Sequence, residues 1–278
     1  MTTSAATVPL TSSSSDVCFF TVGTHFYQNF VPAFVWFAQE SNPGAACEIV
    51  VDDLPLFELR HGDALSALRE RGDVLIRPIP QLRRPPVMDD TYRFILDPMT
   101  VREFTYIGDI DILMLENALE THREVFEAGH SYSNIVRPQS QKLSGLHFTK
   151  TADQYPLGDT SSLVKKYPND EDLLYALVAS QGRLFRDERF TVFRPTLGIH
   201  LSLNRLPFNS PARPGYELTS SYLTTLRDLV NTDGFARFYA VCNDDARGPL
   251  KTAIGLSEMW SAMGTTPIPE WQEYVRGI

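Results

Sequence analysis

The sequence has few cysteines: Cys18, Cys47 and Cys242 are the only ones among its 278 residues. They are too few and too widely spaced for the disulfide framework of a small secreted domain, and their spacing does not match a zinc site. We therefore expect three reduced thiols in a hydrophobic core, as in a protein of the cytoplasm.

Long hydrophobic runs and basic clusters are also missing. No segment approaches the roughly 18 consecutive apolar residues of a membrane-spanning helix, and no basic residue precedes an apolar stretch at the N-terminus, as it would in a signal peptide. The formal net charge is −9 and no stripe of Lys or Arg is present, so nucleic acid, whose phosphates attract basic surfaces, is not an expected partner. We expect a soluble cytoplasmic protein, with peripheral attachment to the inner membrane as the alternative.

What the sequence does contain is an alternation of apolar strands and helices. Its composition, 43% hydrophobic and 21% charged, suits one large domain with a smaller appendage. Residues 1–15, mostly Thr, Ser and Ala, are expected to form a disordered tail. Asn29 is the expected cap of the first helix, with Pro32 in its first turn. Strands are predicted at residues 17–22, 47–51, 74–79 and 104–107, and helices at residues 30–41, 56–71, 91–96 and 116–128. This order predicts an α/β fold with a mostly parallel sheet flanked by helices.

The second half of the chain is less regular. Residues 132–138 are expected to form a loop and residues 151–159 turns, with a strand at residues 143–148 between them. A helix is predicted from Asp170, with Gly182 as its stop. Further strands are predicted at residues 190–193 and 197–203, and helices at residues 217–230, 235–242 and 250–263. We divide the chain into a main domain at residues 16–210 and a helical C-terminal appendage at residues 211–278.

The most informative stretch places two acids next to an apolar strand. Phe104–Ile107 is predicted to be a buried strand, and Gly108 and the Asp109-Ile-Asp111 motif follow it. Residues two apart in extended backbone project to the same side, so the two carboxylates could converge on one hard cation. The alternative is a polar turn between two strands, and the chain has a second Asp-x-Asp at residues 170–172. The apolar flanks favour a metal, because desolvated carboxylates require a partner charge.

Five segments occur in a characteristic order along the chain: FFTVGTHFY at 19–27, TYRFIL at 91–96, YIGDID at 106–111, NDEDLL at 169–174 and GIHLS at 198–202. This order resembles the GT-A glycosyltransferases, and within them glycosyltransferase family 8, the lipopolysaccharide galactosyltransferase and glycogenin type. Gly108 stands where that family has Asp, Glu171 stands where it has Gln, and its late Lys-Pro-Trp is missing. These departures favour a sister family of bacterial polysaccharide glycosyltransferases.

The resemblance implies a set of site residues. It implies a Mn²⁺ or Mg²⁺ ion bound by Asp109, Asp111 and His200. It implies nucleotide contacts from Thr21, Val22, Gly23, Tyr27, Arg93 and Asp109. It implies catalytic or sugar-binding roles for Asp170, Glu171 and Asp172. Apart from the resemblance, we expect acceptor contacts from Asn134 and His147, in the segment from Tyr132 to His147. The alternatives are core histidines at 147 and 200, an exposed helix arginine at 93 and a solvent-facing first-turn acid at 171.

The expected reaction is transfer of a sugar from a nucleotide sugar to a carbohydrate or glycolipid acceptor. The resemblance favours a UDP-sugar donor, retention of configuration and a role in cell-surface polysaccharide or glycoconjugate synthesis. One alternative is a sugar-phosphate nucleotidyltransferase, which the single glycine and missing Lys or Arg at residues 23–27 disfavour. Another is a non-catalytic carbohydrate-binding or scaffold protein. Hydrolases with a nucleophile elbow have no support, because no such motif is present. The sugar, the linkage and the oligomeric state stay open.

Overall fold

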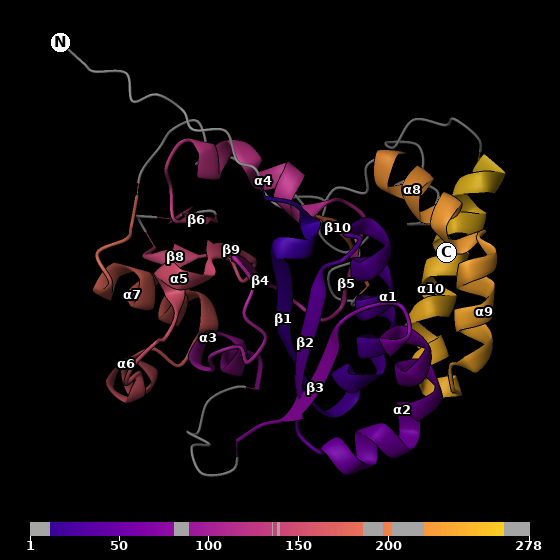
Figure 1. Cartoon of the computed structure of the whole chain (residues 1–278), viewed down its shortest axis with the longest axis horizontal. Helices are drawn as coiled ribbons and strands as arrows, with labels where there is room; N and C mark the ends of the chain where they lie inside the picture. Colours follow the sequence, from indigo (N-terminus) through magenta and orange to yellow (C-terminus); the bar gives the residue numbers. More distant parts are fainter. Residues whose placement is uncertain are drawn as a thin grey trace.

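A computed structural model describes residues 12–80, 89–134, 136–137, 140–185, 197–201 and 220–263. At its centre lies a six-stranded sheet of order β3-β2-β1-β4-β9-β6 (Figure 1). The strands are β1 (Val17–Gly23), β2 (Ala46–Val51), β3 (Val74–Pro78), β4 (Phe104–Ile107), β6 (Tyr132–Ser133) and β9 (His147–Lys150). The pairs β3–β2, β2–β1 and β1–β4 are parallel, whereas β9 is antiparallel to both β4 and β6. The predicted mostly parallel sheet is confirmed.

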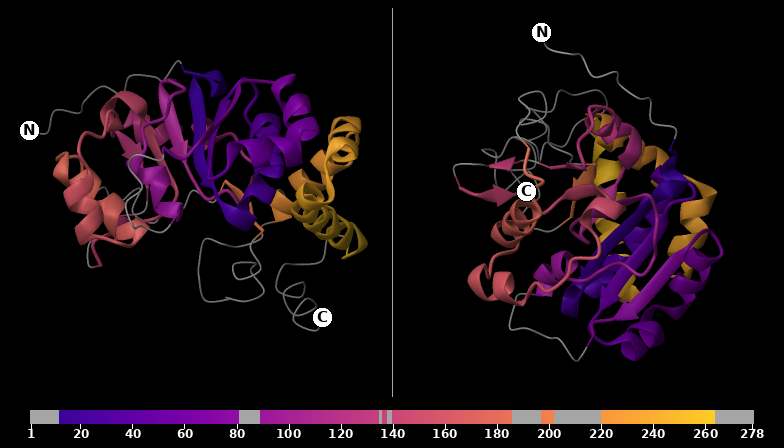
Figure 2. Two further views of the ribbon diagram at one scale, coloured as in Figure 1. Left: turned by 90° about the horizontal axis from the view of Figure 1, so that it is seen from below. Right: turned by 60° about the vertical axis from the view of Figure 1, so that its left-hand side comes forward.

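Helices cover both faces and both ends of this sheet. The N-terminal half supplies the 3-10 helices η1 (Ser14–Asp16), η2 (His25–Phe30) and η4 (Asp89–Thr91) and the helices α1 (Val31–Ser41), α2 (Leu54–Arg69), α3 (Tyr92–Ile95) and α4 (Ala118–Glu127). The remainder supplies α5 (Thr151–Gln154), α6 (Ser161–Lys166), α7 (Asp170–Ser180), α8 (Ser220–Val230), α9 (Asp233–Val241) and α10 (Asp244–Met263). The C-terminal helices lie at one end of the molecule and α6 and α7 at the other (Figures 1 and 2).

The C-terminal helices share a hydrophobic core with the N-terminal half of the chain. Trp36 of α1 is fully buried, and its ring contacts Phe235 edge-on at 5.0 Å and stacks on Phe238 at 6.0 Å between centroids. Both phenylalanines belong to α9. The predicted helical C-terminal region is present, and its apolar faces complete the core around α1. The expected domain boundary at residue 210 lies outside the described residues.

Several local predictions differ from the structure. Asn29 lies inside η2 and does not cap a helix; α1 begins at Val31, so Pro32 occupies its second position. The predicted loop at residues 132–138 contains β6 and β7 (Val136–Arg137), and the predicted strand at residues 143–148 is divided between β8 (Lys142–Leu143) and β9. The predicted turns at 151–159 begin with α5. The strands among these elements are short, and their pairing, of β6 with β9 and of β7 with β8, stabilises them where local propensity does not.

Residues 12–15, which we assigned to the expected tail, belong to the described part of the chain. Ser14 belongs to η1, and its hydroxyl donates a 2.6 Å hydrogen bond to the carbonyl of Pro43. Residues 1–11 and the predicted strand at residues 190–193 lie outside the described residues. All three cysteines are buried free thiols, as predicted. Among the described helices, none combines the length and the apolar character needed to cross a bilayer.

Candidate functional site

The candidate site lies at the carboxyl edge of the parallel strands. The chain adds β2 and β3 on one side of β1 and then β4 on the other, so β1 and β4 border the position where the strand order reverses. Ligands of open α/β sheets bind at such a position. The hydroxyl of Thr21 on β1 donates a 2.6 Å hydrogen bond to the carbonyl of Gly108, which holds the two strand ends together.

Asp109 and Asp111 lie in a turn, not in the extended backbone we predicted. The turn connects β4 to β5 (Ile112–Met114), and the N–H of Ile112 donates to the carbonyl of Asp109 at 3.3 Å. The alternative of a polar turn therefore describes the backbone correctly. It does not describe the environment, because Asp111 is only 5% exposed and Ile110 and Ile112 on either side of it are buried.

A second strand brings His200 to these carboxylates. β10 (Gly198–His200) pairs antiparallel with β5, and His200 is opposite Ile112. The N–H of Leu201 donates to the carbonyl of Asp111 at 2.8 Å, which extends the pairing by one residue. A glycine is required at 198, because a Cβ atom there would lie 1.6 Å from the carbonyl oxygen of Leu113.

Asp109, Asp111 and His200 form a compact cluster of potential metal ligands. Nε2 of His200 lies 3.5 Å from Oδ2 of Asp109, and Nδ1 lies 3.3 Å from Oδ2 of Asp111. One ligand atom from each residue lies within 4.8 Å of the others. Two carboxylate oxygens and one imidazole nitrogen suit Mn²⁺ or Mg²⁺. The residues therefore fit the divalent cation that the sequence predicts.

Arg93 connects this cluster to a second group of acids. Its guanidinium donates from Nη1 to Oδ1 of Asp109 at 2.5 Å and from Nη2 to Oδ2 of Asp170 at 2.9 Å. The alternative of an exposed helix arginine is wrong, because only 7% of the side chain is exposed. Burial alone would lower the pKa of Arg93, but Asp109, Asp170 and Asp90 outweigh it and hold the pKa above its ordinary value. The pKa of Asp90 is raised, mainly by burial.

The three acids at the start of α7 have different partners. Asn169 caps the helix through its side-chain oxygen, which accepts from the N–H groups of Glu171 and Asp172. Asp170 pairs with Arg93, whereas Asp172 and Glu171 lie 3.5 Å and 3.9 Å from Nζ of Lys142. Asp170 is thus connected to the metal-ligand cluster through Arg93.

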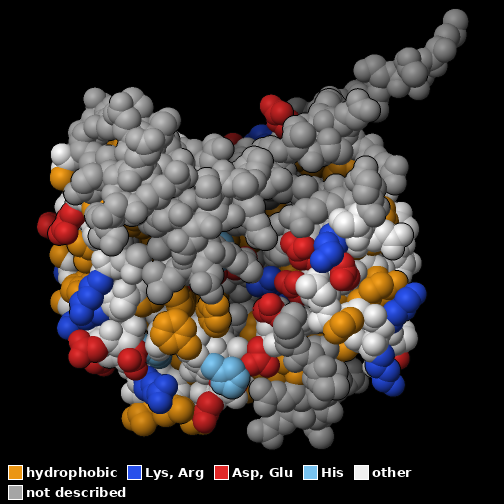
Figure 3. Space-filling view, turned by 180° about the vertical axis from the view of Figure 1, so that it is seen from behind, with side chains coloured by type: hydrophobic (Ala, Val, Ile, Leu, Met, Phe, Trp, Pro, Cys, Tyr) orange, Lys and Arg blue, Asp and Glu red, His pale blue; other side chains and the backbone are white. Residues whose placement is uncertain are grey.

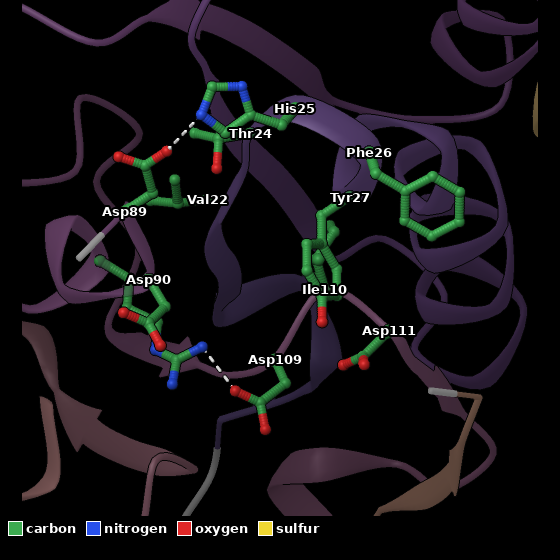
Figure 4. Close-up of a pocket in the computed structure, with 11 residues that line it drawn as sticks. Val22, Thr24, His25, Phe26, Tyr27, Asp89, Asp90, Asp109, Ile110 and Asp111 are labelled. Carbon is green, nitrogen blue, oxygen red and sulfur yellow. Dashed lines mark hydrogen bonds and ion pairs between the residues drawn. The ribbon is translucent and has the colours of Figure 1, made fainter. Parts of the chain in front are cut away.

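A pocket of about 590 Å³ opens beside the cluster. Its described lining consists of Val22, Thr24, His25, Phe26, Tyr27, Asp89, Asp90, Arg93, Asp109, Ile110 and Asp111. Figure 4 shows Asp109 and Asp111 at one end and His25 with Asp89 at the other, with Tyr27 and Ile110 between them. Of the predicted nucleotide contacts, Val22, Tyr27, Arg93 and Asp109 line this pocket. Thr21 and Gly23 are not among the lining residues.

Sequence reasoning missed the residues at the far end of the pocket. The imidazole of His25 lies 3.2 Å from Asp52 and 3.1 Å from Asp89 and is largely exposed. Figure 3 shows one face of the molecule, on which acidic side chains lie close to an exposed histidine and to hydrophobic side chains. Asp52 follows β2 directly, so the rule that located Asp109 could have found it. Asp89 and Asp90 belong to η4, which directly precedes α3, and also line the pocket.

Asn134 and His147 lie in a separate buried cluster. The amide of Asn134 contacts Nδ1 of His147 at 3.2 Å, and the same amide exchanges two hydrogen bonds with the backbone of Ser144. Both side chains are buried, and burial lowers the pKa of His147 to about 3. Neither residue is among the described lining residues of the pocket. Their acceptor role stays a prediction, and the alternative of a core histidine describes the surroundings of His147.

Comparisons with known proteins give no match to a protein-family model and none to a curated protein sequence. Among solved structures, the chain is similar to the glycosyltransferase GlyE of Streptococcus pneumoniae TIGR4, with 12% identity and a TM-score of 0.43 over 64% of this chain and 46% of that one. The apo form of GlyE gives 13% identity and a TM-score of 0.38 over 59% and 43%. This chain thus spans less than half the length of either structure.

Proposed function

We propose that this chain is a metal-dependent glycosyltransferase of the GT-A type, which transfers a sugar from a nucleoside diphosphate sugar to a carbohydrate or glycolipid acceptor. The observation that carries the proposal is the buried cluster of Asp109, Asp111 and His200 beside a pocket of about 590 Å³. A pocket of this size is within the range of sites for small ligands. The motifs shared with family 8 glycosyltransferases support the same activity, most closely that of a sister family.

A divalent cation in this cluster would offset the negative charge that the diphosphate gains as the sugar leaves. Asp109 and Asp111 supply carboxylate oxygens for it, and His200, which is brought back by β10, supplies a nitrogen. Because the cluster lies in a largely buried environment, charges there interact more strongly than they would in water. The diphosphate is therefore assigned to this end of the pocket.

The rest of the pocket suits the nucleoside. Phe26 and Tyr27 line the pocket and keep 67% and 45% of their surface exposed, so their rings are accessible to a ligand. A base stacked on one such ring gains about 1–3 kcal/mol. Asp89 and Asp90 offer carboxylate oxygens to hydroxyl or amino donors. UDP is the first nucleotide to test, because the resemblance favours it.

Asp170 is the acid that we assign to the sugar. It is tied to Asp109 through Arg93, so a sugar attached to a diphosphate at the cluster would lie near it. Glu171 and Asp172 pair with Lys142, which favours an anchoring role for both. The alternative is that the Glu171 carboxylate acts at the sugar, as a nucleophile or as a charge that stabilises the transition state. Retention of configuration and a role in cell-surface polysaccharide synthesis follow only from the resemblance.

A screen for hydrolysis of nucleotide sugars tests this function without knowledge of the acceptor. The expected result is slow release of one sugar that requires Mn²⁺ and disappears in Asp111→Asn. Production of a nucleotide sugar and pyrophosphate from a sugar phosphate and a nucleoside triphosphate would instead identify a nucleotidyltransferase. Absence of metal-dependent binding of any nucleotide would favour a non-catalytic protein.

A further inference from the structure

One carboxylate is shared between the candidate metal site and a fixed cation. Oδ1 of Asp109 accepts from Nη1 of Arg93 at 2.5 Å, whereas Oδ2 of the same residue faces His200 at 3.5 Å. Asp109 therefore contacts the arginine with one oxygen and the metal-ligand cluster with the other. A divalent ion in the cluster and the guanidinium would be separated by little more than this carboxylate.

The guanidinium is held in this position by its surroundings. Asp170 accepts from Nη2 at 2.9 Å, and only 7% of the arginine side chain is exposed. Gly145 packs against it so closely that a Cβ atom there would lie 2.9 Å from Nη2 and 3.7 Å from Oδ1 of Asp109. An arginine side chain does not lose its charge in a protein. Its positive charge is thus a permanent part of the site.

We propose that Arg93 makes cation binding at Asp109, Asp111 and His200 depend on the anionic donor, so that metal and nucleoside diphosphate bind cooperatively. The inference rests on the proposed function, because it assigns the donor's diphosphate to this cluster. Arg93 acts through Asp109. Its guanidinium partly neutralises the Asp109 carboxylate and repels a metal ion bound to the other oxygen of that carboxylate. It is a positioning residue and not a metal ligand.

A diphosphate removes this conflict. Its negative charge would offset both the metal ion and the guanidinium, so the repulsion between these two cations would no longer oppose metal binding. Because coupling between two ligands is reciprocal, the factor by which the diphosphate strengthens metal binding equals the factor by which the metal strengthens diphosphate binding. The same site without Arg93 would lose this dependence, since Asp109 and Asp170 would no longer be paired with the guanidinium and no fixed positive charge would oppose a metal ion at Asp109.

The test compares the full chain with Arg93→Gln, which removes the charge, and Arg93→Lys, which retains it. Binding of Mn²⁺ alone is measured from the electron paramagnetic resonance signal of the free ion, and binding of UDP, GDP and ADP is measured by calorimetry with and without Mn²⁺. Arg77→Gln is the matched control, because Arg77 on β3 forms a similar buried ion pair with Glu48 on β2. Thermal unfolding of each variant establishes that it is folded.

For Arg93→Gln we expect Mn²⁺ alone to bind about 10-fold more tightly, and the coupling between Mn²⁺ and nucleotide to fall by a similar factor. Arg93→Lys and Arg77→Gln should keep the parental coupling. A purely structural role would instead weaken Mn²⁺ binding in Arg93→Gln, and unchanged affinity and coupling would equally overturn the inference. If neither the parent nor any variant binds Mn²⁺, with or without nucleotide, both the proposed function and the inference on Arg93 are overturned. This outcome differs from the two above, in which the parent binds Mn²⁺.

Discussion

Nδ1 of His200 lies 3.3 Å from Oδ2 of Asp111, although the two residues belong to distant parts of the chain. They meet through the two-stranded ladder of β5 and β10, which lies outside the main sheet. The geometry of the candidate metal site therefore depends on a short, separate strand pair. This dependence allows the site to be perturbed without touching any of its ligands.

Asp111→Asn should weaken Mn²⁺ binding by at least about 100-fold, because ligand loss costs more than the 10- to 100-fold typical of supporting residues. The asparagine keeps the shape of the side chain and removes its charge. A calorimetric titration with Mn²⁺ measures the change in affinity. Asp73→Asn is the control, since Asp73 is about half exposed and pairs with Arg102 at the surface. Equal Mn²⁺ affinity in the parent and Asp111→Asn would refute the site.

Gly198→Ala should reduce Mn²⁺ affinity although it alters no ligand. The added Cβ atom would lie 1.6 Å from the Leu113 carbonyl, so β10 must move away from β5 and take His200 with it. We expect an effect comparable with that of His200→Ala. The matched control is Gly62→Ala in α2, where an added Cβ atom meets nothing within 4 Å. If Gly198→Ala and Gly62→Ala bind Mn²⁺ equally well, His200 does not reach the ion through β10.

Asp170→Asn and Glu171→Gln separate the two acids at the start of α7. Asp170 pairs with Arg93 beside the cluster, whereas Glu171 lies 3.9 Å from Lys142. We expect Asp170→Asn to lower turnover by about 100-fold or more with donor binding retained, as for a group acting in the transition state. Glu171→Gln should stay within a few-fold of the parent. A loss of turnover confined to Glu171→Gln would restore the hypothesis of a nucleophilic Glu171.

The free energy of unfolding should fall as the pH drops from about 6.5 to 3. Burial lowers the pKa of both His122 and His147 from 6.5 to about 3 in the folded protein. Between these values the unfolded state binds a proton at each residue and the folded state does not, so each contributes up to about 1.4 kcal/mol per pH unit. The free energy of unfolding, measured with urea, should therefore depend less steeply on pH in His122→Gln than in the parent. The slope should be smaller by up to about 1.4 kcal/mol per pH unit. If the unfolding free energy depends on pH equally steeply in the parent and in His122→Gln, protonation of His122 does not cause the loss of stability.

Trp36→Ala should destabilise the protein by about 3–5 kcal/mol, the cost of removing a large buried aromatic side chain. Its ring packs between α1 and α9. For the same reason a chain ending at residue 210 should expose this surface and lose cooperative unfolding. Urea denaturation of the variant, of Trp36→Phe as the milder control and of the shortened chain measures both effects. A shortened chain with parental stability would establish an independent C-terminal unit.

Local sequence was sufficient for the regular elements. The apolar residues of β1, β2, β3 and β4 and the helices between them follow from hydrophobic pattern and from Pro, Gly and Asx signals, all of which act over a few residues. The same local reading located Asp109 and Asp111, because two acids next to a buried strand are conspicuous in any context. Gly108 also has a local reason: a Cβ atom there would lie 2.6 Å from the ring of Tyr106.

Other features depended on contacts between distant parts of the chain. The short strands β6 and β7 were missed for a different reason, because two residues carry too little local pattern and each strand is defined by its pairing with β9 or β8. The backbone of Asp109 and Asp111 was expected to be extended, since nothing local distinguishes a strand from a tight turn between two strands. The link from Arg93 to Asp170 and the approach of β10 to β5 join segments far apart in sequence. Sequence determined which side chains were available for the site, whereas long-range packing decided which of them meet, because pairing energies between distant segments leave no mark on local pattern.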